Sequence, residues 1–208
     1  MVLALESDGN PNTNAENFAI QAIETVCEEG GEVNFEELYI PIDTPDNSYV
    51  YQGDKQNIPN PLMLSNGILV DITFGTTSDN INADQLVATD LIDGLKFALE
   101  QANINLSTLE QITSIHISST TNGHTNSVSP NHPNGVALDI SRINGKKMIL
   151  SGLTNQIKEL QKAFDNFQYI RENFGPYFKH KYSIEYGTWN YNYPVGGHKD
   201  HIHISIRK

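Results

Sequence analysis

The chain has 208 residues, a length that suits one domain with an appended element. Its 25 Asp and Glu residues outnumber its 13 Lys and Arg residues. Nucleic acid is therefore not an expected partner, because phosphate binding requires a basic face. The single cysteine excludes an internal disulfide and a cysteine-based zinc cluster.

The start of the chain predicts neither a signal peptide nor a membrane anchor. Residues 1–8 lack the basic and apolar regions of a secretory signal. No apolar run approaches the length of a membrane span. We therefore expect synthesis in the cytoplasm. Action on a cell wall would then need release or non-standard export, for example by a delivery particle or secretion machinery.

Residues 1–60 predict an N-terminal extension of helix plus loop or hairpin, and residues 61–208 predict a catalytic domain. In the extension, Asn14 can cap a helix that runs to about Glu29. Cys27 lies in this helical pattern, where we expect it to be a small buried apolar residue.

The second part alternates strand and helix patterns, which predicts an α+β fold with a central antiparallel sheet flanked by helices. Val87, Leu91 and Leu95 recur at helical spacing, and Thr154 can cap a later helix. Asn144-Gly145 predicts a tight turn. The expected elements are a strand at 68–74, a helix at 84–103, strands at 112–118 and 136–141, a helix from 154 to about 170, an aromatic loop at 182–193 and a strand at 200–206.

The last expected strand places histidines on one face. Side chains alternate across a strand, so Ile202 and Ile204 point to one side and His201 and His203 to the other. The isoleucines would pack on a helix. The two histidines therefore point together to the opposite face.

The strand at 136–141 repeats this pattern with an acid. Asp139 lies opposite the apolar Leu138 and Ile140, and if the two strands are neighbours it faces the histidines. His132 enters from the preceding loop, where Gly135 allows the backbone to turn. Zinc takes imidazole nitrogen and carboxylate oxygen, and a catalytic zinc keeps three protein ligands. His132, Asp139 and one closing histidine would supply such a set.

These motifs resemble a known family. The pattern His132-x-x-Gly135-x-Ala137-x-Asp139, followed by His201-x-His203, resembles the zinc peptidases grouped as lysostaphin, D-Ala-D-Ala peptidase and hedgehog relatives. It is most similar to the D-Ala-D-Ala carboxypeptidases and murein endopeptidases, and it covers roughly residues 112–206. The resemblance implies that His132, Asp139 and His203 bind zinc and that His201 assists catalysis.

The sequence departs from this family pattern at three places. Pro130 stands where many relatives carry Ser, and Asp200 stands where many carboxypeptidases carry a Glu base. The segment 118–131 has no Arg to grip a terminal carboxylate; it has His124 as a weak substrate-binding candidate. His198-x-x-His201-x-His203 resembles the penicillin-insensitive murein endopeptidases, so we expect an endopeptidase rather than a carboxypeptidase.

Other residues near the motifs are candidates for catalysis and substrate binding. His201 shares the strand face of the ligand and is the expected proton carrier, and His198 is expected to hold the oxyanion or the substrate. Asp200 ranks below both, because strand alternation points it away from His201. Trp189 and Tyr191 either wall a groove for a peptide or glycan strand or pin their own loop.

The expected function is zinc-dependent cleavage of peptide bonds in peptidoglycan stem peptides or cross-links. A non-catalytic zinc module of hedgehog type would keep the same ligands and bind a partner. A non-haem iron oxygenase also uses two histidines and one carboxylate. Its usual pair is His-x-Asp, whereas six residues separate His132 from Asp139.

Overall fold

The computed structural model describes residues 50–75, 85–121 and 130–207. Of these, residues 50–75, 85–121, 130–193 and 198–207 belong to the second of the chain's two units. The fold described below is that of the second unit. The helix expected at 14–29, with Cys27, lies outside the described residues.

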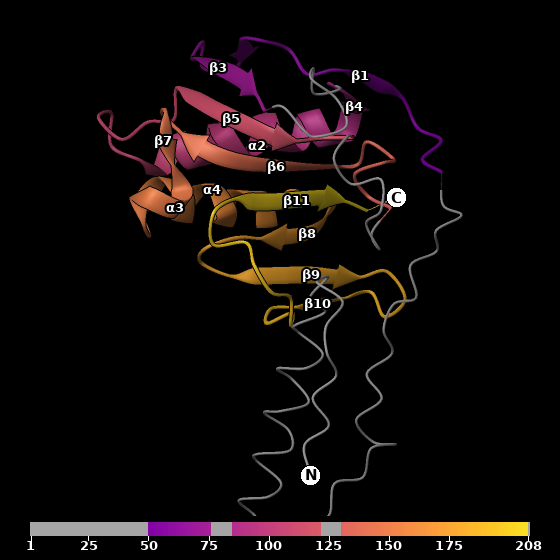
Figure 1. The fold of residues 1–208 in the computed structure, drawn as a ribbon. Helices are drawn as coiled ribbons and strands as arrows, with labels where there is room; N and C mark the ends of the chain where they lie inside the picture. The colour runs from indigo at the N-terminus through magenta and orange to yellow at the C-terminus, as the bar shows by residue number, and fades with distance from the viewer. Residues whose placement is uncertain (1–49, 76–84, 122–129, 208) are drawn as a thin grey trace, which may run out of the picture. The chain divides into compact units, whose positions relative to one another are not determined.

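The second unit is built on a mostly antiparallel sheet (Figure 1). Its strands are β2 (Leu62–Met63), β3 (Leu69–Phe74), β5 (Ser114–Ser119), β6 (Ala137–Ile143), β7 (Lys146–Lys147), β8 (Ile170–Phe174), β9 (Lys179–Ser183), β10 (Thr188–Asn190) and β11 (Ile202–Ile206). Their order is β10-β9-β8-β11-β6-β5-β3-β2, and β7 pairs with β6. Only β3 and β5 run parallel among these pairs of described strands.

A second small sheet joins β1 (Lys55–Asn57) to β4 (Leu86–Ala88). Tyr51 and Ile58 are buried in the core beside it. The expected boundary at residue 60 therefore lies inside this unit. The helix predicted from residue 84 was placed too early, because residues 86–88 pair with β1 as a strand.

The described helices are α2 (Thr89–Asn105), α3 (Met148–Ser151) and α4 (Asn155–Asp165). Both long helices, α2 and α4, lie behind the sheet in Figure 1. Buried leucines of α2 and the isoleucines of β6 and β11 belong to one apolar cluster. These elements confirm the predicted α+β class, and the described helices leave the other face of the sheet open.

Two sequence predictions about the C-terminal half were wrong. The helix capped by Thr154 ends at Asp165 rather than near residue 170, although the Thr154 cap is confirmed by a 3.4 Å bond from the Ile157 amide to its hydroxyl. Residues 170–174 instead form β8 beside β11. The expected aromatic loop is the β9–β10 hairpin, in which Trp189 pairs with Tyr182. Pairing with distant strands overrode the local helical spacing.

Candidate metal centre

Asp139 and His203 lie directly opposite each other on neighbouring strands. The register of β6 and β11 pairs their Cα atoms, and Asp139 Oδ1 lies 2.8 Å from His203 Nδ1. Directly paired residues share a face of the sheet. The prediction that the two strands are neighbours and present this pair to one site is therefore confirmed.

His132 joins this pair from the turn before β6. The Gly135 amide bonds to the His132 carbonyl at 2.8 Å, and Gly135 has a φ of 69°, a conformation that favours glycine. The turn places His132 Nε2 3.2 Å from His203 Nδ1 and 3.4 Å from Asp139 Oδ1. All three residues are buried, with 3 to 8 % of their surface exposed.

The three donor atoms have the spacing of a metal site. Donors of a tetrahedral zinc with bonds of about 2.0–2.1 Å lie roughly 3.3 Å apart. The observed separations of 2.8, 3.2 and 3.4 Å bracket that value. The His132–Asp139–His203 cluster could therefore hold a metal ion.

Hydrogen bonds behind the cluster orient both rings. His132 Nδ1 donates to the Thr120 carbonyl at 2.5 Å, which turns Nε2 toward His203 and Asp139. His203 Nε2 lies 3.4 Å from Glu172 Oε2, so a proton there leaves Nδ1 for a metal. Carboxylates and carbonyls that fix the tautomer in this way are typical partners of metal-ligating histidines.

Glu172 is a member of this site that the sequence did not reveal. It lies on β8, and its Oε2 accepts bonds from Asn131 Nδ2 at 2.6 Å and Ser205 Oγ at 2.7 Å. Lys181 Nζ lies 3.5 Å from its other oxygen. The sequence predicted a helix to about residue 170 and no strand after it, so it gave no reason to place Glu172 beside His203. The spacing of Glu172 and Phe174, two positions apart and so on one face of a strand, was the available signal.

The buried charges of the cluster stabilise one another. Burial by itself lowers the pKa of His203, but hydrogen bonds and charges from Asp139 and Glu172 raise that pKa to about 10. Burial raises the pKa of Glu172, yet His203 and Lys181 hold it far below its ordinary value. A metal ion bound at His203 would compete with the proton that these carboxylates favour.

His198 and His201 lie beside the cluster. Their ring centres are 4.9 Å apart, and the ring of His198 is 5.8 Å from that of His203. His201 Nδ1 lies 2.8 Å from Asp200 Oδ1. The expectation that Asp200 points away from His201 was wrong, because β11 and its alternation begin only at Ile202.

His198 has a backbone conformation that is uncommon for a residue other than glycine. Its φ is 61°, and its ring meets the edge of Phe174 at 5.3 Å. Such conformations cost energy and often occur where a side chain must be held for function. The structure therefore brings His198 next to the expected ligand His203, and His201 lies beside His198.

The expected substrate-binding aromatics lie elsewhere. Strand registers place His203, Phe174 and Lys179 on one face and Asn173 and His180 on the other. Trp189 pairs with Tyr182 and stacks on Tyr191, whose ring meets His180. Trp189 and Tyr191 are therefore on the face opposite the cluster. His124 lies outside the described residues.

Tyr193 is the aromatic residue of this segment that faces the cluster. Its ring stacks on Phe174 at 5.6 Å, and Phe174 stacks on His203 at 5.7 Å. Lys181 Nζ donates to the Tyr193 hydroxyl at 3.1 Å. The side of the His132–Asp139–His203 cluster toward β9 is thus lined by Phe174 and Tyr193.

In comparisons with known proteins, no family model, no curated protein and no solved structure matches the chain. The resemblance to zinc peptidases therefore rests on the motif residues and their geometry alone. None of the described helices is long and apolar enough to cross a membrane.

Proposed function

We propose that the cluster binds zinc and that the protein is a zinc-dependent peptidase that cleaves peptide bonds in peptidoglycan stem peptides or cross-links. The observation that carries the proposal is the convergence of His132 Nε2, His203 Nδ1 and Asp139 Oδ1 within 2.8–3.4 Å. Two nitrogens and one carboxylate oxygen match the ligand set of many catalytic zinc sites, which keep a fourth position open. The family motif supplies the substrate class.

The chain's own residues suit proton transfer beside such a metal. A bound zinc would lower the pKa of a water molecule to about 7 and polarise the scissile carbonyl. Asp200 fixes His201 through Nδ1, so Nε2 of His201 is free to accept a proton and pass it to the leaving amine. His198 would hold the oxyanion or the substrate, and Phe174 and Tyr193 would wall the peptide.

An endopeptidase is favoured over a carboxypeptidase. A bidentate guanidinium is the natural partner of a terminal carboxylate. The segment 118–131, where relatives carry that Arg, has none. The enzyme should therefore prefer bonds inside a cross-linked peptide.

Metal analysis tests the first half of the proposal. The purified protein should hold about one zinc per chain, and His132→Ala, Asp139→Ala and His203→Ala should each lose most of it. His201→Ala should keep the zinc and lose activity by roughly 10²–10⁴. Full zinc occupancy in His203→Ala would overturn the ligand assignment.

Digestion of purified peptidoglycan tests the second half. Cross-linked muropeptide dimers should fall to monomers, and the monomers should keep their terminal D-Ala when analysed by mass spectrometry. Release of D-Ala from pentapeptides with dimers intact would instead indicate a carboxypeptidase. Zinc binding without any hydrolysis would favour the non-catalytic, partner-binding module of hedgehog type.

A further inference from the structure

A second row of polar side chains crosses the sheet near the metal cluster. Arg142 on β6 pairs with His116 on β5 and with Lys147 on β7. His116 in turn pairs with Thr73 on β3, whose hydroxyl lies 2.8 Å from its Nδ1. We call Thr73, His116, Arg142 and Lys147 the basic row.

The basic row lies on the open face of the sheet. Ile115 and Ile117 flank His116 along β5, and both are buried in the apolar cluster on the helix side. Alternation therefore points His116 to the opposite face. Its partner Arg142 shares that face with Asp139, although three positions separate them on β6, because the β5–β6 register shifts between His116 and Ile117. Asp139 and His203 occupy that same face.

Arg142 and Lys147 oppose each other on paired strands although both are cations, and no ion pair in the described part of the chain offsets their repulsion. Like charges at directly opposed strand positions destabilise a sheet. Burial and the charge of Arg142 both lower the pKa of His116, as expected for a site of positive potential. Among the described residues, no carboxylate lies within ion-pair distance of Arg142 or Lys147. Asp71 shares a face of β3 with Thr73, and its carboxylate forms no ion pair with Arg142 or Lys147.

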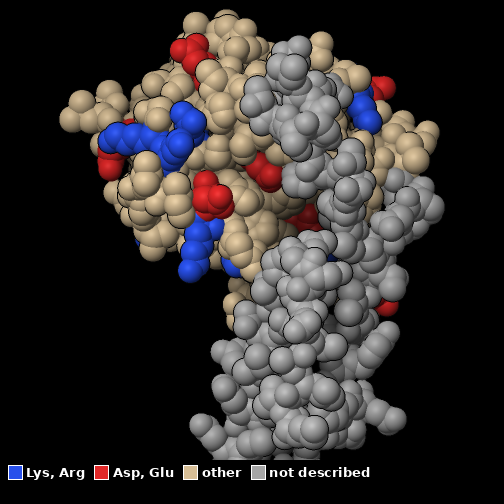
Figure 2. Space-filling view, viewed as in Figure 1, with Lys and Arg blue, Asp and Glu red and all other residues tan. Residues whose placement is uncertain are grey.

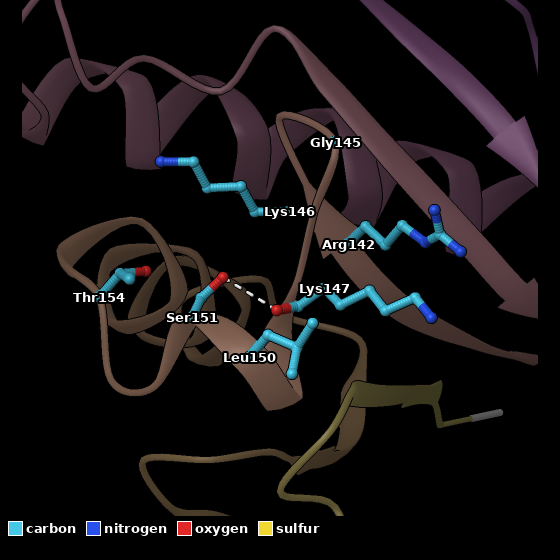
Figure 3. A pocket seen from close by; sticks show the side chains of 7 residues that line it. All are labelled: Arg142, Gly145, Lys146, Lys147, Leu150, Ser151 and Thr154. Atoms are coloured by element: carbon cyan, nitrogen blue, oxygen red, sulfur yellow. Dashed lines mark hydrogen bonds between the residues drawn. The ribbon is translucent and has the colours of Figure 1, made fainter.

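The two cations border a depression of about 500 Å³ (Figure 3). The side chains of Arg142 and Lys147 extend side by side, whereas Lys146 extends the other way. Figure 2 shows Lys and Arg gathered toward this edge of the visible face. The lining residues are Arg142, Gly145, Lys146, Lys147, Leu150, Ser151 and Thr154.

The basic row stands at a defined distance from the metal cluster. Arg142 follows Asp139 by three positions on β6, which corresponds to roughly 10 Å at the usual rise of a strand. An extended peptide covers that distance in about three residues. A terminal carboxylate, one residue beyond the cleaved bond, would lie closer to the metal than this.

We propose that the basic row binds the carboxylate of an acidic residue located about three residues from the cleaved bond of a peptide substrate. This inference rests on the proposed peptidase function and names its substrate class, an acidic peptide. The planar guanidinium of Arg142 suits bidentate binding of the carboxylate, and Lys147 adds a point charge.

The test compares two forms of one substrate. Cross-linked muropeptide dimers are used with their internal carboxylates free or converted to amides. For the wild-type protein, KM should be about 10-fold higher for the amide form than for the carboxylate form, with little change in kcat. Arg142→Gln and Lys147→Gln should remove this difference. Lys146→Gln, on the same hairpin but pointing away, should retain it.

Equilibrium binding of both dimers to the zinc-loaded His201→Ala variant, measured by calorimetry, separates this inference from the peptidase proposal. If Arg142→Gln abolishes a preference for the carboxylate form in this binding assay, while the wild-type protein with His201 intact cleaves neither dimer, the subsite would be supported and the peptidase refuted. Equal binding and equal cleavage of the two forms would overturn the subsite. Loss of the preference in Lys146→Gln as well would also overturn it, since a diffuse surface charge would then suffice.

Discussion

At the residue scale, the geometry of the His132–Asp139–His203 cluster depends on which ring nitrogen of each histidine is already engaged. Thr120 holds Nδ1 of His132 and Glu172 faces Nε2 of His203, so each ring turns its other nitrogen inward. Glu172 is in turn fixed by Asn131 and Ser205. The residues behind the ligands therefore determine how well the cluster is prepared for a metal.

Glu172→Gln should weaken metal binding without unfolding the protein. Gln has the same shape, but its neutral amide no longer stabilises the proton on His203 Nε2. Removal of such a partner commonly costs about 10–100-fold in metal affinity. Competition with a chromogenic chelator measures this. Glu185→Gln, the same exchange at an exposed position between β9 and β10, serves as the control, and an unchanged affinity in Glu172→Gln would refute the orienting role.

At the element scale, the turn before β6 and the junction after α4 are the two features that position the site. The turn ends at Gly135, whose amide closes it on the His132 carbonyl. The junction ends α4 at Asp165 and allows residues 170–174 to enter the sheet with Glu172. A helix continued to residue 170 would remove the start of β8.

Gly135→Ala should lower metal affinity through the backbone. An added Cβ would lie 3.2 Å from the Leu86 carbonyl oxygen, at a φ of 69° that strains any other residue. Gly67→Ala is the matched control, because its φ is 84° and nothing lies within 4 Å of the added Cβ. Both should lose about 1 kcal/mol in urea unfolding from backbone strain. Only Gly135→Ala should bind zinc more weakly; equal affinities would contradict this account.

Asp165→Asn should change how stability depends on pH. Burial raises the pKa of Asp165, and this outweighs the hydrogen bonds from Asn173 and His180 that lower it. A carboxyl whose folded pKa lies above its unfolded value binds more protons when folded, so stability falls as pH rises through that interval. Between pH 3.5 and 5.5, the free energy of unfolding of Asp165→Asn should therefore rise relative to that of the wild type. A constant difference would contradict the raised pKa.

At the scale of the whole molecule, the charge is unevenly distributed along the chain. Residues 1–49 hold 11 of the 25 acidic side chains and none of the 13 basic ones, which leaves 14 acidic against 13 basic residues from 50 onward. The part of the chain that carries the metal cluster is thus almost neutral. Local charges such as the basic row therefore determine its electrostatics more than the overall balance does.

Metal loading should stabilise the folded protein as a whole, because the three ligands come from separate segments that meet only in the fold. A metal at 100 times its dissociation constant adds about 2.7 kcal/mol, which corresponds to a rise in Tm of roughly 5–10 °C. Calorimetry with and without a chelator measures the shift. His203→Ala should show none, and an equal shift in that variant would indicate metal bound elsewhere.

The sequence by itself determined which faces of β6 and β11 the residues Leu138, Asp139, His203 and Ile204 occupy. Alternation placed Asp139 opposite Leu138 and His203 opposite Ile204, and the glycine at 135 indicated the turn that carries His132. These features are local, because a strand's two faces and a glycine's positive φ depend on a few neighbouring residues.

Only the tertiary structure decided which strands are neighbours and where β8 to β10 lie. Ile157, Phe164 and Ile170 fit a helix equally well on local spacing, yet Ile170 belongs to a strand because β11 offers it a partner. The same pairing brought Glu172 behind His203 and turned Trp189 and Tyr191 to the far face. Pairing between residues distant in sequence depends on burial and hydrogen bonds across the whole sheet, which no local pattern specifies.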